Sequence, residues 1–133
     1  MDPSSVPPAV DAALDAFLRA FNGLDFERFR ACLADHVTLF APVAAQTGLV
    51  EGKPAVEAHF SRVFEHEAPA GPNVRPRNIR RMSLGPEGAL VTFEFPRGDG
   101  SMGRRSLAFQ LIGGGWKIAH IHASNGDPPR GQA

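Results

Sequence analysis

The chain has 133 residues, of which 43% are hydrophobic and 21% are charged, and its formal net charge is zero. These values are typical of one soluble globular domain, and the absence of any apolar run of about 18 residues excludes a membrane-spanning helix. The single cysteine, Cys32, excludes an internal disulfide, and together with an N-terminus unlike a signal peptide it predicts a cytoplasmic protein.

Charge is unevenly distributed along the chain. Residues 1–67 contain ten acidic and five basic residues, whereas residues 68–133 contain four acidic and nine basic ones. The basic excess is mostly arginine, and it includes the cluster Arg75, Arg77, Arg80 and Arg81. A nucleic-acid surface would interleave such a cluster with aromatic side chains, which are absent here. The composition therefore favours a small anionic partner, for which arginine offers a planar fork of donors.

The first half of the chain is predicted to be mainly helical. Residues 1–8 are expected to form a flexible tail, and apolar residues then recur with helical spacing from Val10 to Phe21. Asn22-Gly23 would end this helix with a left-handed residue. Asp25 is the predicted N-cap of a second helix whose apolar side carries Phe26, Phe29 and Leu33.

A short strand, VTLFAP, is expected next, followed by the loop AAQTGLVEG. Pro54 suits the first turn of a third helix. The buried stripe of that helix is predicted to be Val56, Phe60, Val63 and Phe64, and His59 lies beside it.

After Asn73 the hydrophobic pattern changes to that of strands. Short glycine-rich segments separate NIRRMSL, ALVTFEFPR, RRSLAFQLI and WKIAHIHAS, which predicts an antiparallel meander. The whole order predicts one α+β domain over residues 9–125, with three N-terminal helices on one face of the sheet and a second flexible tail over residues 126–133. Because several strands are apolar on both faces, a homodimer partner is expected to cover the other face.

Three segments carry a family resemblance: AFNGLDFERFRACLADHVTLFAP, VEGKPAVEAHF and GGGWKIAHIHAS. They resemble the nuclear transport factor 2-like superfamily, and within it the SnoaL-like (polyketide cyclase-like) proteins. The resemblance implies a cone-shaped, curved antiparallel or mixed sheet packed on three helices, an internal cavity and a homodimer. It leaves function open, because the superfamily includes isomerases, cyclases, dehydratases and hydrolases as well as transport factors and oligomerising domains.

The ketosteroid isomerase-like members of this superfamily place an aspartate base just before a proline after the first strand. The corresponding residue here is Ala41, before Pro42. Those members also use a tyrosine on the first helix, where this chain has Phe17, and the chain contains no tyrosine at all. Two of the three expected catalytic groups are absent, so we exclude that chemistry.

The SnoaL cyclases use an acidic general acid/base near a histidine, which makes His59 and Glu94 the catalytic candidates. If Glu94 points into the cavity, it could transfer a proton there. Alternatively, it pairs with an arginine such as Arg105 on the next strand, or it faces solvent. His59 is either presented to a ligand or is a boundary histidine bonded to the backbone.

The last strand contains a His-x-His pair. Period-two alternation places Trp116, Ile118, His120 and His122 on one face and Lys117, Ala119, Ile121 and Ala123 on the other. A metal site needs a third ligand, and none stands at a recognisable spacing, so no metal is predicted. We expect the first face to form the dimer interface and the second to line the cavity, unless a β-bulge exchanges them.

The association domain of calcium/calmodulin-dependent kinase II has a similar last strand, with a pocket arginine at the position of Ala123 here. The difference weakens any prediction of the same anion site on that strand.

The predicted ligand is a small apolar or weakly acidic molecule, bound without a cofactor. Its walls are expected to be Phe17, Phe40, Phe60, Phe93 and Phe109, and Arg81 and Arg105 are expected to meet an acidic group. Any reaction would be acid/base chemistry of the isomerase, cyclase or dehydratase type. The alternative is a non-catalytic binding or oligomerisation module, which the missing aspartate and tyrosine favour.

Overall fold

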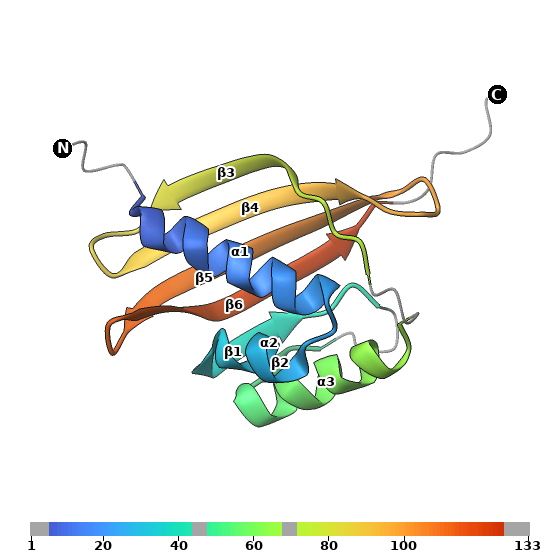
Figure 1. Cartoon of the computed structure of the whole chain (residues 1–133), viewed down its shortest axis with the longest axis horizontal. Coiled ribbons are helices and arrows are strands. Elements are labelled where there is room, and N and C mark those ends of the chain that lie inside the picture. Colours follow the sequence, from blue (N-terminus) through green and yellow to red (C-terminus); the bar gives the residue numbers. More distant parts are fainter. Residues whose placement is uncertain (1–5, 44–47, 68–71, 127–133) are drawn as a thin grey trace.

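The computed structural model describes residues 6–43, 48–67 and 72–126. These residues form an α+β domain of helices and one curved sheet (Figure 1). In chain order the elements are α1 (Pro8–Asn22), α2 (Phe26–Ala31), β1 (Leu33–Phe40), β2 (Val50–Glu51), α3 (Lys53–Glu65), β3 (Arg77–Ser83), β4 (Gly88–Pro96), β5 (Met102–Ile112) and β6 (Gly115–Asn125).

The sheet has the strand order β2-β1-β6-β5-β4-β3. Strands β3 to β6 form the predicted antiparallel meander, and β1 joins it by pairing parallel to β6. The sheet is therefore mixed. Strands β2 and β3 each have only one neighbouring strand in it, so the sheet does not close on itself. Helix α1 lies across one face, which we call the inner face, and the opposite face is called the open face (Figure 1).

The helix boundaries follow the sequence with two differences. Asp25 is the N-cap of α2 as predicted, since its Oδ1 accepts a hydrogen bond from the Arg28 N–H at 3.1 Å. The left-handed residue after α1 is Leu24, with φ of 55°, whereas Gly23 has φ of −87°. The prediction that Asn22-Gly23 supplies this residue is therefore wrong. Leu33 starts β1 instead of extending α2.

A further difference lies in the segment expected to be a loop. Val50 and Glu51 form β2, which pairs antiparallel with Leu39 and Thr38 of β1. A two-residue strand has no periodicity of its own, so only pairing with β1 reveals it.

The core lies between the helices and the inner face of the sheet. Phe29 of α2 is at its centre, fully buried, with ring centroids 5.2 Å from Phe17, 4.7 Å from Phe60 and 5.2 Å from Phe64. Aromatic pairs at these distances add attraction beyond the area they bury. The helices are thus held to one another by phenylalanine rings.

Strand β4 supplies the sheet's side of the core by simple alternation. Its residues Val91, Phe93 and Phe95 are buried on the inner face. Leu90 and Glu94 alternate with them and are only half-buried. The two-sided pattern predicted for this strand is confirmed.

A β-bulge interrupts the alternation in β6. Ala108 of β5 pairs with His120, but the next residue, Phe109, pairs with Ile118, so Ala119 has no partner of its own. Ile118 therefore faces the core and is fully buried.

Trp116 also packs against the core cluster, before the bulge. After the bulge, Ile121 and Ala123 lie on the inner face and are buried, while His120 and His122 lie on the open face. The prediction that one face carries Trp116, Ile118, His120 and His122 is therefore wrong.

The predicted tails, residues 1–8 and 126–133, fall largely outside the described residues. Val6 is described and packs against the core cluster. Among residues 6–43, 48–67 and 72–126, no helix is long and apolar enough to cross a membrane.

Candidate ligand-binding cavity

A cavity of about 270 Å³ lies between α1, α3 and the inner faces of β4, β5 and β6. Three of the five predicted wall residues line it, namely Phe17, Phe60 and Phe93. Further walls come from Phe95 and Leu107, which were not predicted as wall residues, and from Ile121 and Ala123, which belong to the strand face that was expected to line the cavity. Alternation from Phe93 and Phe109 would have identified the first two.

Two of the predicted wall phenylalanines lie elsewhere. Phe109 is 2% exposed and belongs to the core away from the cavity. Phe40 is 38% exposed and lies on the open face, with its ring centroid 5.2 Å from that of His122. Neither phenylalanine lines this cavity, and Phe40 pairs with His122 across the parallel β1–β6 ladder and shares its face.

His59 is the titratable side chain that α3 contributes to the cavity. It is 8% exposed, and its ring packs edge-on against Phe60 at 5.3 Å. Burial lowers the pKa of His59 below its usual value, and the nearby charge of Arg62 lowers it further. The imidazole is therefore neutral at pH 7 and able to accept a proton.

Arg105 is the cationic side chain that β5 contributes to the cavity. Its Nη1 donates hydrogen bonds to the Ser124 carbonyl at 3.1 Å, to Asn125 Oδ1 at 3.3 Å and to the Arg104 carbonyl at 2.9 Å. The guanidinium carbon lies 4.8 Å from the centre of the Phe95 ring, a cation–π contact. All these partners are uncharged groups.

No carboxylate of the described residues lies within ion-pairing distance of Arg105. Burial lowers the pKa of Arg105 to about 10, and the charge of Arg97 contributes to that shift. The side chain stays cationic at neutral pH. A cation in an apolar wall is stabilised by an anion, so this arrangement suits an acidic ligand.

Ala123 pairs directly with Arg105 across β5 and β6. The small side chain at 123 leaves room on the inner face beside the guanidinium. The presence of Ala123 on β6 weakened the prediction of an anion site. Arg105, its partner on β5, nevertheless places a cation on the cavity wall beside it.

Comparisons with known proteins identify the family of this chain. Residues 10–128 match the SnoaL-like domain family. The chain belongs to this family. A search of the curated proteins finds no match to this SnoaL-like domain.

Solved structures of the nuclear transport factor 2-like fold resemble this SnoaL-like domain. One is a nuclear transport factor 2-like protein of unknown function from Pseudomonas putida, with TM-score 0.75 and 21% identity over 88% of this chain and 84% of that one. Another is a provisionally assigned dehydratase from Streptomyces avermitilis, with TM-score 0.74 and 19% identity over 88% and 93%. A third is the association domain of C. elegans calcium/calmodulin-dependent kinase II, with TM-score 0.66 and 21% identity over 88% and 93%. At these identities the likeness concerns the fold.

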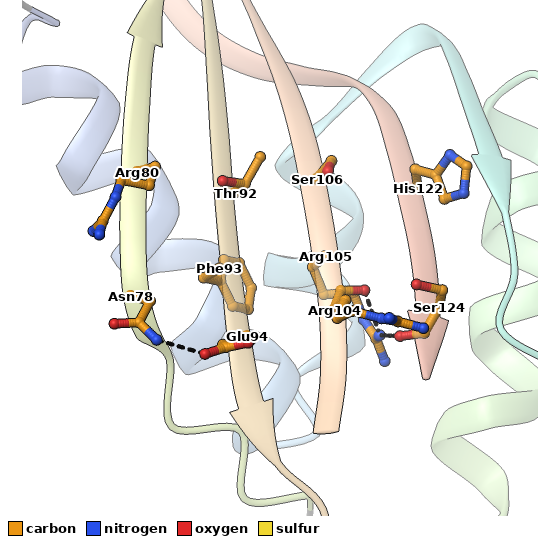
Figure 2. A pocket seen from close by; sticks show the side chains of 10 residues that line it. All are labelled: Asn78, Arg80, Thr92, Phe93, Glu94, Arg104, Arg105, Ser106, His122 and Ser124. Atoms are coloured by element: carbon orange, nitrogen blue, oxygen red, sulfur yellow. Dashed lines mark hydrogen bonds between the residues drawn. The ribbon is translucent and has the colours of Figure 1, made fainter. Parts of the chain in front are cut away.

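Glu94 and Arg81 do not line the cavity of this SnoaL-like domain. Glu94 lies on the open face and accepts a hydrogen bond from Asn78 Nδ2 (Figure 2). Its cross-strand neighbour is Arg104, whereas Arg105 pairs with Phe93. The fold thus separates Glu94 from His59.

Arg81 instead joins β3 to α1. Its Nε donates to Asp11 Oδ1, and the two side chains are 40% and 51% exposed. This ion pair lies outside the cavity lining, so the predicted contact of Arg81 with a cavity ligand is not supported.

The open face carries a second, wider hollow. Figure 2 shows its floor, where Arg80, Thr92, Ser106 and His122 form one row across four neighbouring strands. This hollow is open to solvent and largely polar, and Arg80 and His122 are exposed. The inner cavity is the better candidate, because it is enclosed by apolar walls that also hold His59 and Arg105.

The His-x-His pair lies beside this hollow. His120 Nδ1 is 2.7 Å from Thr38 Oγ1, and the two imidazole centroids are 6.3 Å apart. Burial lowers the pKa of His120, the nearby His122 lowers it further, and a hydrogen bond with the Thr38 backbone opposes the shift. Among the described residues, no three His, Cys, Asp or Glu side chains are grouped as metal ligands.

Proposed function

We propose that this SnoaL-like domain binds a small, largely apolar molecule with one acidic group in the cavity between α1, α3 and the inner face of the sheet. The observation that carries the proposal is Arg105, a guanidinium in an apolar cavity without a carboxylate partner among the described residues. The acidic group of the ligand would pair with Arg105, and its apolar body would contact Phe17, Phe60 and Phe93.

His59 and Glu67 are the titratable acid/base side chains that line this cavity. His59 is the more buried of the two, and we assign it the role of moving a proton. Its lowered pKa keeps it neutral at pH 7, so it can act as a general base on a bound ligand without a cofactor. This arrangement fits the isomerase, cyclase or dehydratase type of chemistry. Glu94 has no part in the proposal, because it lies on the open face.

Ligand binding is tested with a panel of small aromatic and alicyclic acids, followed by NMR and calorimetry. We expect Arg105→Leu to abolish binding of the acids. Arg104→Leu is the matched control, because it removes the neighbouring arginine from the exposed side of the same strand. Equal affinity in the two variants would contradict the assignment of the cavity.

Proton transfer is tested in deuterium oxide with the bound acids. We expect the native protein to accelerate exchange of the hydrogens between the carboxyl and keto groups of a bound 3-oxo acid, which the keto group acidifies, and His59→Gln to lose this acceleration with binding retained. Ser61→Ala is the control for a disturbance of α3. If exchange is absent from the native protein and from every ligand that binds, the domain is a binding module and His59 has a structural role.

A second candidate function, self-association as a homodimer, is favoured by apolar side chains on the open face. Met82 is 57% exposed and Phe40 is 38% exposed, and His120 and His122 lie next to Phe40. Ile118 and Trp116 have no place in such an interface, because they pack in the core of the same chain.

Sedimentation velocity tests the dimer. We expect the native chain to sediment as a dimer and Phe40→Glu to sediment as a monomer. Leu84→Glu is a matched control, because Leu84 is 55% exposed but lies beyond the end of β3. A monomeric native chain at high concentration would exclude this function.

A further inference from the structure

The hydrogen bonds of Arg105 leave one edge of its guanidinium group free. Nη1 donates all three bonds to described residues, and Nε and Nη2 donate no bond to that part of the chain. No fully buried side-chain nitrogen or oxygen of the described residues lacks a partner. Nε and Nη2 therefore keep some exposed surface, and Arg105 is one of the residues that line the cavity.

The plane of this guanidinium is held by Phe95. The Phe95 ring lies under it, and Phe95 pairs across the sheet with Gly103. A Cβ atom at position 103 would overlap the Phe95 ring, so the glycine gives the ring the space that it occupies. The backbone carbonyl of Ser124 and the side-chain amide of Asn125 hold the other end of the group.

We infer that the cavity selects a planar carboxylate, bound side-on by the Nε–Nη2 edge of Arg105, over tetrahedral anions of equal size. This inference rests on the proposed function and names the substrate class. The edge presents two parallel N–H donors, which match the two coplanar oxygens of a carboxylate.

A sulfonate or phosphonate carries a third oxygen outside that plane. The apolar walls Phe93, Phe95 and Leu107 offer no hydrogen-bond donor from their side chains. Arg97 and Asn125 also line the cavity, but Arg97 pairs with Asp99. The Asn125 amide lies at the Nη1 end of Arg105. The third oxygen would therefore lose its hydration without a replacement partner, which is unfavourable. The same walls accept the apolar body of a carboxylic acid.

The size of the cavity limits the rest of the ligand. Its volume of about 270 Å³ is slightly below the range of about 300 to 1,000 Å³ that holds drug-sized ligands. The substrate class is therefore a small monocarboxylate with a single ring or a short chain. Phe95 and Gly103 act as positioning residues for the arginine that binds it.

The experiment measures dissociation constants for phenylacetate, 3-phenylpropionate, benzylsulfonate, benzylphosphonate and the uncharged 2-phenylethanol. We expect the native protein to bind the two carboxylates about tenfold or more tightly than the tetrahedral anions. Arg105→Lys keeps the charge but removes the planar edge, so it should weaken carboxylate binding by about 10- to 100-fold and remove the selectivity. Arg104→Lys, on the open face, should change neither.

Phe95→Leu tests the positioning role. It removes the ring beneath the guanidinium and should lower the ratio of carboxylate to sulfonate affinity. A purely structural role would weaken both ligands equally. Circular dichroism establishes that each variant is folded, and if a variant does not fold, the selectivity of the native protein among the four anions decides the question.

The outcomes separate the two levels of the proposal. Equal affinities of the native protein for carboxylates and tetrahedral anions would overturn the carboxylate inference, and so would unchanged carboxylate binding by Arg105→Lys. Both results leave the proposed cavity function standing. Failure of all five compounds to bind, 2-phenylethanol included, would overturn the proposed function itself.

Discussion

The inner and open faces of the sheet use the same residue types for different purposes. Arg105 lines the apolar cavity, donates to backbone carbonyls and lies over Phe95. Arg104, one residue earlier, is exposed on the open face opposite Glu94. Because neighbouring residues of a strand point to opposite faces, position in the alternation decides whether an arginine is solvated or faces a ligand.

The histidines differ in the same way. His59 is buried beside the cavity, and burial lowers its pKa. His122 is exposed, next to Phe40. The comparison implies that substitutions on the inner side change stability and ligand binding, whereas their neighbours on the open face change little.

The largest effect is expected from truncation of a buried inner-face residue. Leu107 is fully buried, and Leu107→Ala should lower the free energy of unfolding by about 2–5 kcal/mol through lost contacts and the cavity left behind. Ser106→Ala, on the open face of the same strand, should stay within about 0.5 kcal/mol. Urea denaturation measures the free energy of unfolding of both variants. Equal losses would contradict the expected difference between the inner and open faces.

A smaller loss of stability is expected when the contact between Asn22 and Val74, a residue of the cavity wall, is removed. The Asn22 amide bonds both backbone groups of Val74, with Nδ2 donating to the carbonyl at 3.0 Å and Oδ1 accepting from the N–H at 2.9 Å. Asn22→Ala leaves two part-buried backbone groups without these partners and should cost about 1–3 kcal/mol. Asn73→Ala, an exposed neighbour, is the control in the same denaturation experiment. A loss as small as that of the control would mean that water replaces the amide.

A change in the pH dependence of stability is expected from His59. Burial holds its folded pKa below the unfolded value of about 6.5, so the unfolded chain binds the proton more readily. Stability from this group is complete above the unfolded pKa and is lost as the pH falls through 6.5 toward the folded pKa, with a limiting slope of about 1.4 kcal/mol per pH unit.

His59→Gln should therefore flatten the loss of stability as the pH falls below about 6.5. Urea denaturation at several pH values measures the slope. His120 has a lowered pKa as well and keeps part of the slope in the variant. An unchanged profile in His59→Gln would show that His59 stays solvated in the folded state.

The smallest effect is expected from the ion pair at the edge of the sheet. Arg81 and Asp11 are both largely exposed, and exposed pairs contribute at most about 1 kcal/mol. Asp11→Asn should lower stability by no more than that, and added salt should reduce the difference. Thermal unfolding at low and high salt measures it. A larger loss would show that this pair fastens α1 to β3.

Much of the fold is predictable from the sequence, because the patterns that specify it are local. Helical spacing located α1 and α3, and alternation in β4 and β5 placed Phe93 and Leu107 on the buried face. The candidate site was predicted only in part. His59, Arg105 and three wall phenylalanines line the cavity, whereas Phe40, Phe109 and Arg81 do not.

By itself, the sequence determined which segments form helices and strands and which face of β4 and β5 is apolar, since these depend on residues close together in the chain. The tertiary structure decided the parallel pairing of β1 with β6, the bulge at Ala119 and the free edge of Arg105. These features depend on register between strands far apart in sequence. The unpaired residue Ala119 places His120 on the opposite face of the sheet from Ile118. After a bulge, every side chain lies on the other face from the one that simple alternation predicts.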